Sequence, residues 1–213
     1  MANVTIIGAG NMARGIGTRL LAGGADLQIL APTADHATSL AGELGGESGT
    51  VTGGGTQEPL DGDVVILATP YDGALEFTGA HADDLGGKVV VDITNPVDWA
   101  TFDGLVTPAD SSAAEEIATQ LPDSRVVKAF NTTFAGTLGV GDVSEQQLDV
   151  FVAGDDEDAK AQVAALVDAG GMRAIDAGPL RRARQLEHMG FLHMALQDRL
   201  GTGFGSAIKV VTP

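Results

Sequence analysis

The sequence predicts an α/β protein built on a doubly wound, mostly parallel β-sheet with helices on both faces. Short apolar runs alternate along the chain with longer segments whose apolar residues recur at helical spacing. The short runs are continuously apolar, which is typical of strands buried on both faces of a parallel sheet. Many of the 30 glycines also lie where a strand would meet a helix.

The first 93 residues show this alternation most clearly. Strands are expected at residues 4–7, 27–30, 64–68 and 89–93, with a short one around Val51, and helices at residues 11–22, 33–44 and 72–85. Gly23 and Gly24 end the first helix, and Pro32 or Thr33 begins the second.

The second half continues the pattern up to Pro179. Strands are expected at residues 125–130, 149–153 and 172–176, and helices from a capped start at 111–116 and at 156–169. After Pro179 the chain predicts one helix at 181–199, then three closely spaced glycines and an apolar run at 208–211. We therefore expect one domain over residues 1–178 and a small C-terminal helical extension over residues 179–213.

Composition excludes several classes of function. The chain has no cysteine, which excludes disulfides, thiolate metal sites and cysteine nucleophiles. Its formal net charge of −17 argues against nucleic acid and against anionic membrane surfaces as partners, because both need a basic footprint. No apolar stretch approaches the roughly 18 residues of a membrane span, and no export signal opens the chain, so a cytoplasmic protein is expected.

The strongest motif lies between the first predicted strand and the first predicted helix. It is a G-x-G-x-x-A turn, formed by Gly8, Ala9, Gly10, Asn11, Met12 and Ala13. The first glycine permits the tight turn, the second lets the backbone approach a pyrophosphate, and the alanine allows close packing of helix on strand. The free amides of the helix N-terminus attract the phosphates. This context indicates a Rossmann-type domain that binds a nicotinamide dinucleotide.

The end of the second strand bears on which dinucleotide is bound. An acidic residue there binds the ribose 2′-hydroxyl of NAD, but this chain has Ala31, Pro32 and Thr33. Thr33, the following helix amides and His36 are candidates for accepting a 2′-phosphate, although no arginine is present to clamp it. NADP is favoured, and NAD stays open as the alternative.

Several further segments, in order along the chain, resemble the coenzyme F420-dependent NADP oxidoreductases, which share a fold with the reductase domain of the STEAP metalloreductases. These segments are 7–12, 68–71, 92–96, 154–156 and 176–180, together with the terminal glycines Gly201, Gly203 and Gly205 leading into Ile208. The resemblance covers essentially the whole chain. Two positions depart from it, because Ala31 and Pro32 replace a serine–arginine pair, and Asn131 stands where a histidine is common beside the deazaflavin.

The resemblance implies hydride transfer between NADP(H) and coenzyme F420 or a flavin, with no catalytic side chain and no metal. The dinucleotide would run from the glycine turn across Thr69, Pro70 and Tyr71 to Asn95 and Pro96. The second ring system would lie over residues 131–134, with Asn131 and Ala135 as binding residues, closed by the C-terminal helix. A homodimer through that helix is expected.

Three other activities compete with this interpretation: a flavin or ferric-chelate reductase, a non-catalytic NAD(P) sensor, and an imine reductase, which would need a longer C-terminal domain. Outside the motifs, we expect His188 and His193 to be packing or interface residues, and Arg181, Arg182 and Arg184 to form a solvated helix start. Trp99 and Phe102 are expected to anchor a loop against the core, with a mobile lid as the alternative.

Overall fold

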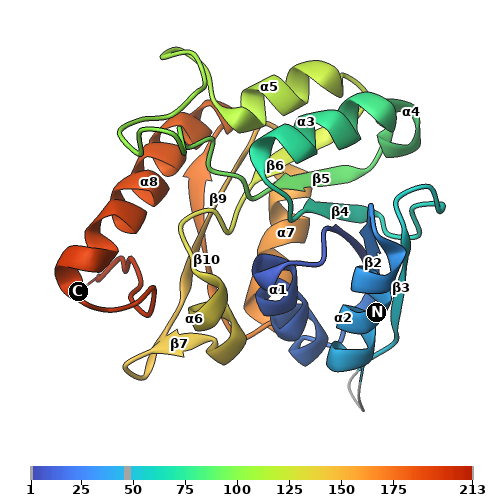
Figure 1. Cartoon of the computed structure of the whole chain (residues 1–213), viewed down its shortest axis with the longest axis horizontal. Helices are drawn as coiled ribbons and strands as arrows, with labels where there is room; N and C mark the ends of the chain where they lie inside the picture. The colour runs from blue at the N-terminus through green and yellow to red at the C-terminus, as the bar shows by residue number, and fades with distance from the viewer. Residues whose placement is uncertain (1, 46–48, 213) are drawn as a thin grey trace.

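The computed structural model describes residues 2–45 and 49–212, and it contains one eight-stranded sheet in the order β10-β9-β6-β5-β4-β1-β2-β3 (Figure 1). The strands are β1 (Asn3–Ile7), β2 (Asp26–Ala31), β3 (Val51–Gly55), β4 (Val64–Leu67), β5 (Val89–Asp92), β6 (Arg125–Lys128), β9 (Asp149–Gly154) and β10 (Arg173–Gly178). Every pairing is parallel except that of β6 with β9. The predicted doubly wound, mostly parallel sheet is therefore confirmed.

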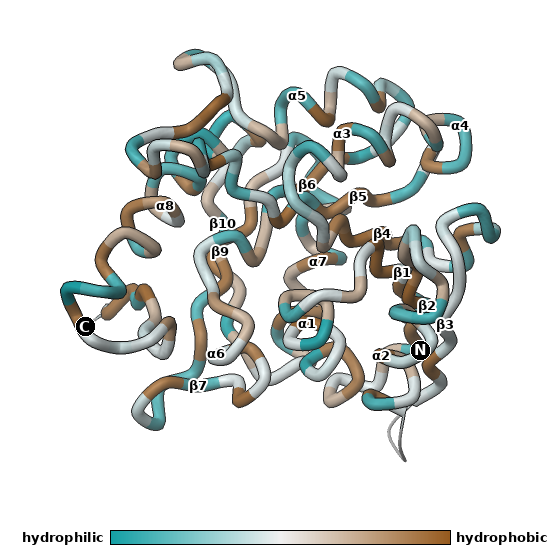
Figure 2. Tube along the Cα trace, in the orientation of Figure 1, coloured by the Kyte–Doolittle hydropathy of each residue, from teal (hydrophilic) through white to brown (hydrophobic). Residues whose placement is uncertain are grey.

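Helices cover both faces of the sheet. They are α1 (Asn11–Ala22), α2 (Ala34–Leu44), α3 (Tyr71–Ala80), α4 (Ala82–Leu85), α5 (Ala113–Gln120), α6 (Ala135–Val140), α7 (Glu157–Ala169), the 3-10 turn η1 (Leu180–Arg182) and α8 (Ala183–Leu200). One apolar core joins the sheet to α1, α2, α6 and α7, and a second joins it to α3, α4 and α5. The central strands are the most hydrophobic part of the trace (Figure 2), as expected where a sheet is buried on both sides.

Two parts of the structure differ from the prediction. The single helix expected at 72–85 is divided at His81, where α3 ends and α4 begins; the φ of His81 is −123°. Helix α6 and the hairpin of β7 (Asp142–Val143) and β8 (Gln146–Gln147) were not predicted, because three glycines between 136 and 141 mask the helical pattern.

Strand β9 runs antiparallel to β6 and overlaps it at one end only. Only its last residues, Ala153 and Gly154, pair with β6, opposite Lys128 and Val127. Its first residues therefore extend past the carboxyl end of β6. The C-terminal tail reaches this extension, where Lys209 and the Val210 amide bond to Asp149.

Among the described helices, none is both long and apolar enough to cross a bilayer.

Candidate functional site

The turn between β1 and α1 combines a crowded glycine with an open one. Gly8 has a φ of +117°, and a Cβ there would lie 2.3 Å from the carbonyl oxygen of Ala68. At Gly10, which caps α1, a Cβ would meet nothing within 4 Å. No side chain caps this helix, and its first turn carries no acidic residue. Its free amides therefore face open space, as a phosphate site requires.

A cavity of about 480 Å³ opens beside this turn. It crosses the carboxyl ends of β1, β4, β5 and β6 and is closed on one side by α8, which contributes Met194. Its lining residues are Gly10, Asn11, Met12, Ala68, Thr69, Pro70, Tyr71, Ile93, Thr94, Asn95, Trp99, Asn131, Thr133, Phe134, Ala135 and Met194. The strand ends of an open parallel sheet are where such folds bind ligands.

The lining carries no carboxylate, lysine, arginine or histidine among its described residues. Tyr71 is its one titratable side chain, and burial together with the negative charge of Glu116 and Glu187 raises the pKa of its phenol. The hydroxyl is therefore a neutral hydrogen-bonding group at neutral pH. Such a lining can hold and orient a ligand, but it offers no general base near neutrality.

Three polar atoms in the lining residues are buried without a partner among the described residues: Oγ1 of Thr69, Oγ1 of Thr94 and Oδ1 of Asn131. Asn131 is held in place, because its Nδ2 donates to Oδ1 of Asn95 at 2.9 Å and to the carbonyl of Leu186 at 2.8 Å. Buried polar atoms without partners are rare in folded proteins. Together with the open space at Gly10, they fit a ligand that carries both phosphates and an amide.

The structure brings together nine of the residues predicted to bind cofactor, namely Gly10, Asn11, Met12, Thr69, Pro70, Tyr71, Asn95, Asn131 and Ala135. Gly8 and Ala9 form the turn itself, and Pro96 lines a neighbouring cavity of about 360 Å³. The remaining predicted residues lie outside this cavity, at the end of β2 and the start of α2. Of these, Ala31 is buried, whereas Pro32, Thr33 and His36 are exposed.

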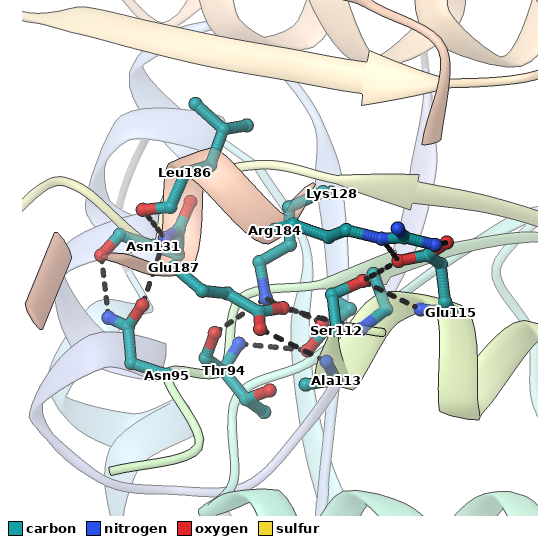
Figure 3. Close-up of polar contacts among 12 residues, drawn as sticks. Thr94, Asn95, Ser112, Ala113, Glu115, Lys128, Asn131, Arg184, Leu186 and Glu187 are labelled. Carbon is teal, nitrogen blue, oxygen red and sulfur yellow. Dashed lines mark hydrogen bonds and ion pairs between the residues drawn. The ribbon is translucent and has the colours of Figure 1, made fainter. Parts of the chain in front are cut away.

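A buried ion cluster beneath the cavity was not predicted. Lys128, at the end of β6, is fully buried and lies 2.7 Å from Asp92 of β5 and 2.8 Å from Glu187 of α8. Glu187 also accepts hydrogen bonds from the first amides of α5, at Ala113 and Ala114 (Figure 3). Asp92, Lys128 and Glu187 lie far apart in the sequence. Nothing in the residues around any of them indicates that the three side chains meet.

Burial and charge act in opposite directions on Lys128 and Glu187. Burial opposes the charge on Lys128, but the two carboxylates outweigh it and raise the pKa of the ammonium. Burial, opposed by Lys128, raises the pKa of Glu187. The cluster ties α8 to the carboxyl ends of β5 and β6.

Helix α8 also approaches the site very closely at Gly190. A Cβ there would lie 2.8 Å from Oδ1 of Asn95 and 2.9 Å from the carbonyl of Asn131. Nearer the start of the helix, Arg184 forms an ion pair with Glu115 at 2.6 Å. The expectation that Arg184 is merely solvated is therefore wrong, whereas Arg181 and Arg182 are exposed.

The aromatic residues after Asn95 also depart from expectation. Trp99 is 69% exposed and Phe102 is 42% exposed, so neither anchors its loop in the core. His193 does pack, stacking on Phe134 with ring centres 4.3 Å apart, and burial lowers its pKa. His188 is exposed and bonds only to the carbonyl of Arg184.

Comparison with known proteins places this geometry in a family. The sequence profile described as NADP oxidoreductase, coenzyme F420-dependent, matches residues 3–96. The F420-dependent NADP reductase of Methanothermobacter marburgensis is 31% identical over 193 residues, covering 84% of this chain and 85% of that protein. A crystal structure of a putative F420-dependent NADP reductase from Arthrobacter sp. FB24 is 26% identical, with a TM-score of 0.84 over the full length of both chains.

Two other relatives match over a smaller part of their own length. The F420-dependent NADP reductase of Methanocaldococcus jannaschii is 38% identical over 131 residues, or 60% of this chain and 58% of that protein. Metalloreductase STEAP3 of Rattus norvegicus is 29% identical over 184 residues, which is 86% of this chain but only 35% of the relative.

Proposed function

The chain belongs to the family of coenzyme F420-dependent NADP oxidoreductases, and on that basis we propose that it transfers a hydride between NADP(H) and coenzyme F420 or a similar flavin-like acceptor. The observation that carries the proposal is the cavity across four strand ends, with an open glycine turn at one end and Met194 of α8 at the other. A bound nicotinamide supplies the transferable hydride itself. The residues of this chain need only bind, orient and exclude water.

The dinucleotide half of the site would be built from the first part of the chain. Gly8 and Ala9 shape the turn, and Gly10, Asn11 and Met12 receive the pyrophosphate. Ala31, Pro32, Thr33 and His36 would surround the adenosine ribose and its 2′-phosphate. Thr69, Pro70, Tyr71, Asn95 and Pro96 would line the path to the nicotinamide.

The acceptor half would be built from later residues. Asn131 and Ala135 would contact the second ring. The side-chain Oδ1 of Asn131 has no partner among the described residues, which suits a ring N–H or the N–H of a carboxamide. In this proposal residues 1–178 form the dinucleotide domain, and residues 179–213 cover the acceptor side.

We further propose a cytoplasmic homodimer. The outer face of α8 exposes Leu192, Leu196 and Leu200, and a second copy could cover this apolar surface. Light scattering of the purified protein tests the dimer, and a monomer at micromolar concentration would contradict it.

The activity is tested by mixing the protein with NADPH and oxidised coenzyme F420 and following the deazaflavin absorbance. Parallel reactions use NADH, free flavins and a ferric chelate. Bleaching with NADPH supports the proposal, and bleaching only with NADH would keep the reaction but reverse the cofactor preference. Binding of NADP without turnover of any acceptor would favour a redox sensor.

A flavin or ferric-chelate reductase is the second candidate, and two observations favour it. The STEAP3 relative aligns with 86% of this chain. The described lining of the cavity also offers no cationic side chain for an anionic acceptor tail. Reduction of flavin or ferric chelate without reduction of F420 would select this candidate.

A further inference from the structure

Trp99 is the only tryptophan in the chain, and it stands where two cavities meet. It lines the 480 Å³ cavity described above and a second one of about 360 Å³. The two cavities share Pro70, Tyr71, Asn95 and Trp99 in their walls. The second cavity therefore continues the first beyond Trp99, on the side of residues 96–98 and Val106.

The loop that carries Trp99 is tightly constrained. Asp98 accepts hydrogen bonds from the amide of Ala100 at 3.0 Å and from Oγ1 of Thr101 at 2.8 Å. The loop is closed by a hydrogen bond from the Asp98 amide to the carbonyl of Gly104 and by an antiparallel bridge between Val97 and Leu105. These contacts hold the backbone that carries the indole, although most of the surface of the indole is exposed.

An aromatic contact connects this loop to α8. The ring centre of Phe102 lies 5.8 Å from the ring centre of Trp99 and 5.5 Å from that of Phe191 in α8. Trp99 is therefore supported on one side, while its cavity side stays uncovered. Aromatic rings bind flat partners by stacking with ring centres 4.5–7 Å apart, so a supported, uncovered indole suits a planar ligand.

Charge limits the class of that ligand. The described residues that line the two cavities include no lysine or arginine, and the second cavity carries the carboxylates of Asp72 and Asp98. An anionic group placed there would be repelled and would find no partner. The second cavity suits the uncharged part of a planar ring, with any anionic tail directed to solvent.

We propose that Trp99 is the aromatic wall on which the ring of the hydride acceptor stacks, and that the second cavity takes the end of that ring remote from the nicotinamide. This inference rests on the proposed function. It makes Trp99 the residue that selects planar acceptors. It assigns to the acceptor the end of the second cavity at Asp98 and Val106, whereas the walls nearer Pro96 stay on the nicotinamide path.

Binding measurements test the inference without turnover. Equilibrium dialysis, with NADP saturating, gives the Kd of riboflavin, FMN and oxidised F420 for the wild type, Trp99→Phe, Trp99→Ala and the control Val140→Ala. Val140 is also exposed, at 66%, and lies outside both cavities. We expect Trp99→Ala to raise the Kd of all three acceptors about tenfold, equivalent to about 1.4 kcal/mol, as for bases stacked on aromatic residues.

The other variants sharpen the result. Trp99→Phe keeps a stacking face and is expected to raise the acceptor Kd about threefold or less, whereas Val140→Ala leaves it unchanged. The Kd of NADP, measured separately, stays the same in all variants. FMN is expected to bind no more tightly than riboflavin, because its phosphate gains no cationic partner.

Three outcomes would overturn the inference. An unchanged acceptor Kd in Trp99→Ala would show that the indole does not stack on the ring. A raised Kd for NADP in the same variant would assign Trp99 to the dinucleotide. FMN binding tenfold tighter than riboflavin would show that an anionic group is recognised. Failure of hydride transfer alone would refute the proposed function, while the dialysis would still decide the role of Trp99.

Discussion

Gly8 and Gly10 belong to the same motif, but they are required for different physical reasons. Gly8 is required by the fold, because its φ is positive and a Cβ would collide with the Ala68 carbonyl. Gly10 has a φ of −88° and open space in front of it, so the fold tolerates a side chain there. Only a ligand would make the absence of a side chain at Gly10 necessary.

Gly10→Val therefore separates binding from stability. We expect the melting temperature to change by no more than a few degrees, because a Cβ at this position meets no atom within 4 Å. The Kd of NADP should rise at least tenfold, because the side chain occupies the space in front of the helix amides. Isothermal titration calorimetry measures the Kd. NADP binding equal to wild type would place the phosphates elsewhere.

The carboxylate of Asp149 makes a pH-dependent contribution to the stability of the fold. Its buried carboxylate accepts hydrogen bonds from Arg173, Lys209 and the Val210 amide. Burial alone would raise the pKa of this carboxyl, but these bonds lower it to about 2. Because the folded pKa lies below the unfolded value of about 3.9, its stabilisation is complete above about pH 4 and is lost as the pH falls toward 2.

Asp149→Asn should remove this dependence. We expect the variant to lose about 1–3 kcal/mol near neutral pH, as for a hydrogen bond to a charged group, and to differ less from wild type at pH 2. Urea unfolding at pH 2, 3, 4 and 7 measures the difference. A constant difference across these pH values would contradict the assignment.

At the scale of elements, α8 is fastened to the sheet at two places that flank the site. Glu187 reaches Lys128 beneath the cavity, and Gly190 lies against Asn95 and Asn131 at its wall. The shape of the site therefore depends on the position of α8. Both contacts connect residues about 60 positions or more apart in the sequence.

Removing the charge of Lys128 should be strongly destabilising. Lys128→Met leaves Asp92 and Glu187 buried as an uncompensated pair of carboxylates, and breaking a buried ion pair costs about 3–5 kcal/mol. The triple variant with Asp92→Asn and Glu187→Gln removes all three charges, so we expect it to recover part of this loss. Chemical denaturation measures both. A triple variant less stable than Lys128→Met would contradict this account.

A methyl group at Gly190 should push α8 away from the site. We expect Gly190→Ala to destabilise the fold by about 1–3 kcal/mol through overpacking, and to weaken acceptor binding. Gly42→Ala is the matched control, because Gly42 lies inside α2 with nothing within 4 Å of its Cβ position. That variant should gain about 0.5–1 kcal/mol. Equal effects of the two substitutions on melting temperature would show that α8 is not packed as described.

At the scale of the whole molecule, acidic side chains dominate. The formal net charge is −17, and several of the 12 basic side chains already form ion pairs, namely Arg14, Lys128, Lys160, Arg173, Arg184 and Lys209. The surplus of carboxylates repels itself in the compact state. This repulsion is long-ranged at low ionic strength.

Salt should therefore stabilise the protein. Raising NaCl from about 0.01 M to 1 M shortens the Debye length from about 30 Å to about 3 Å, which screens repulsion between surface carboxylates. We expect the melting temperature at neutral pH to rise by several degrees, measured by circular dichroism. A fall would mean that exposed ion pairs, which salt also screens, contribute more than the repulsion opposes.

Local signals explain what the sequence could predict. The order of strands and helices followed from apolar periodicity, and the glycine turn followed from its spacing, because neighbouring residues determine both. The site's deeper parts depend on contacts between distant residues. Lys128 reads as part of a buried strand, and nothing near Glu187 in the sequence indicates that it meets Lys128. The sequence predicted that Trp99 anchors a loop against the core, but its exposure depends on the fold of that loop.

The position of Glu187 so late in the chain has a consequence for synthesis. Translation delivers β1, α1 and the other strands that line the cavity, up to β6, before α8 leaves the ribosome. A nascent chain can thus assemble the glycine turn early, while Lys128 still has Asp92 but lacks its second carboxylate. The half of the cavity beside the glycine turn can form during translation, and the half under α8 closes only when residues 183–200 have emerged.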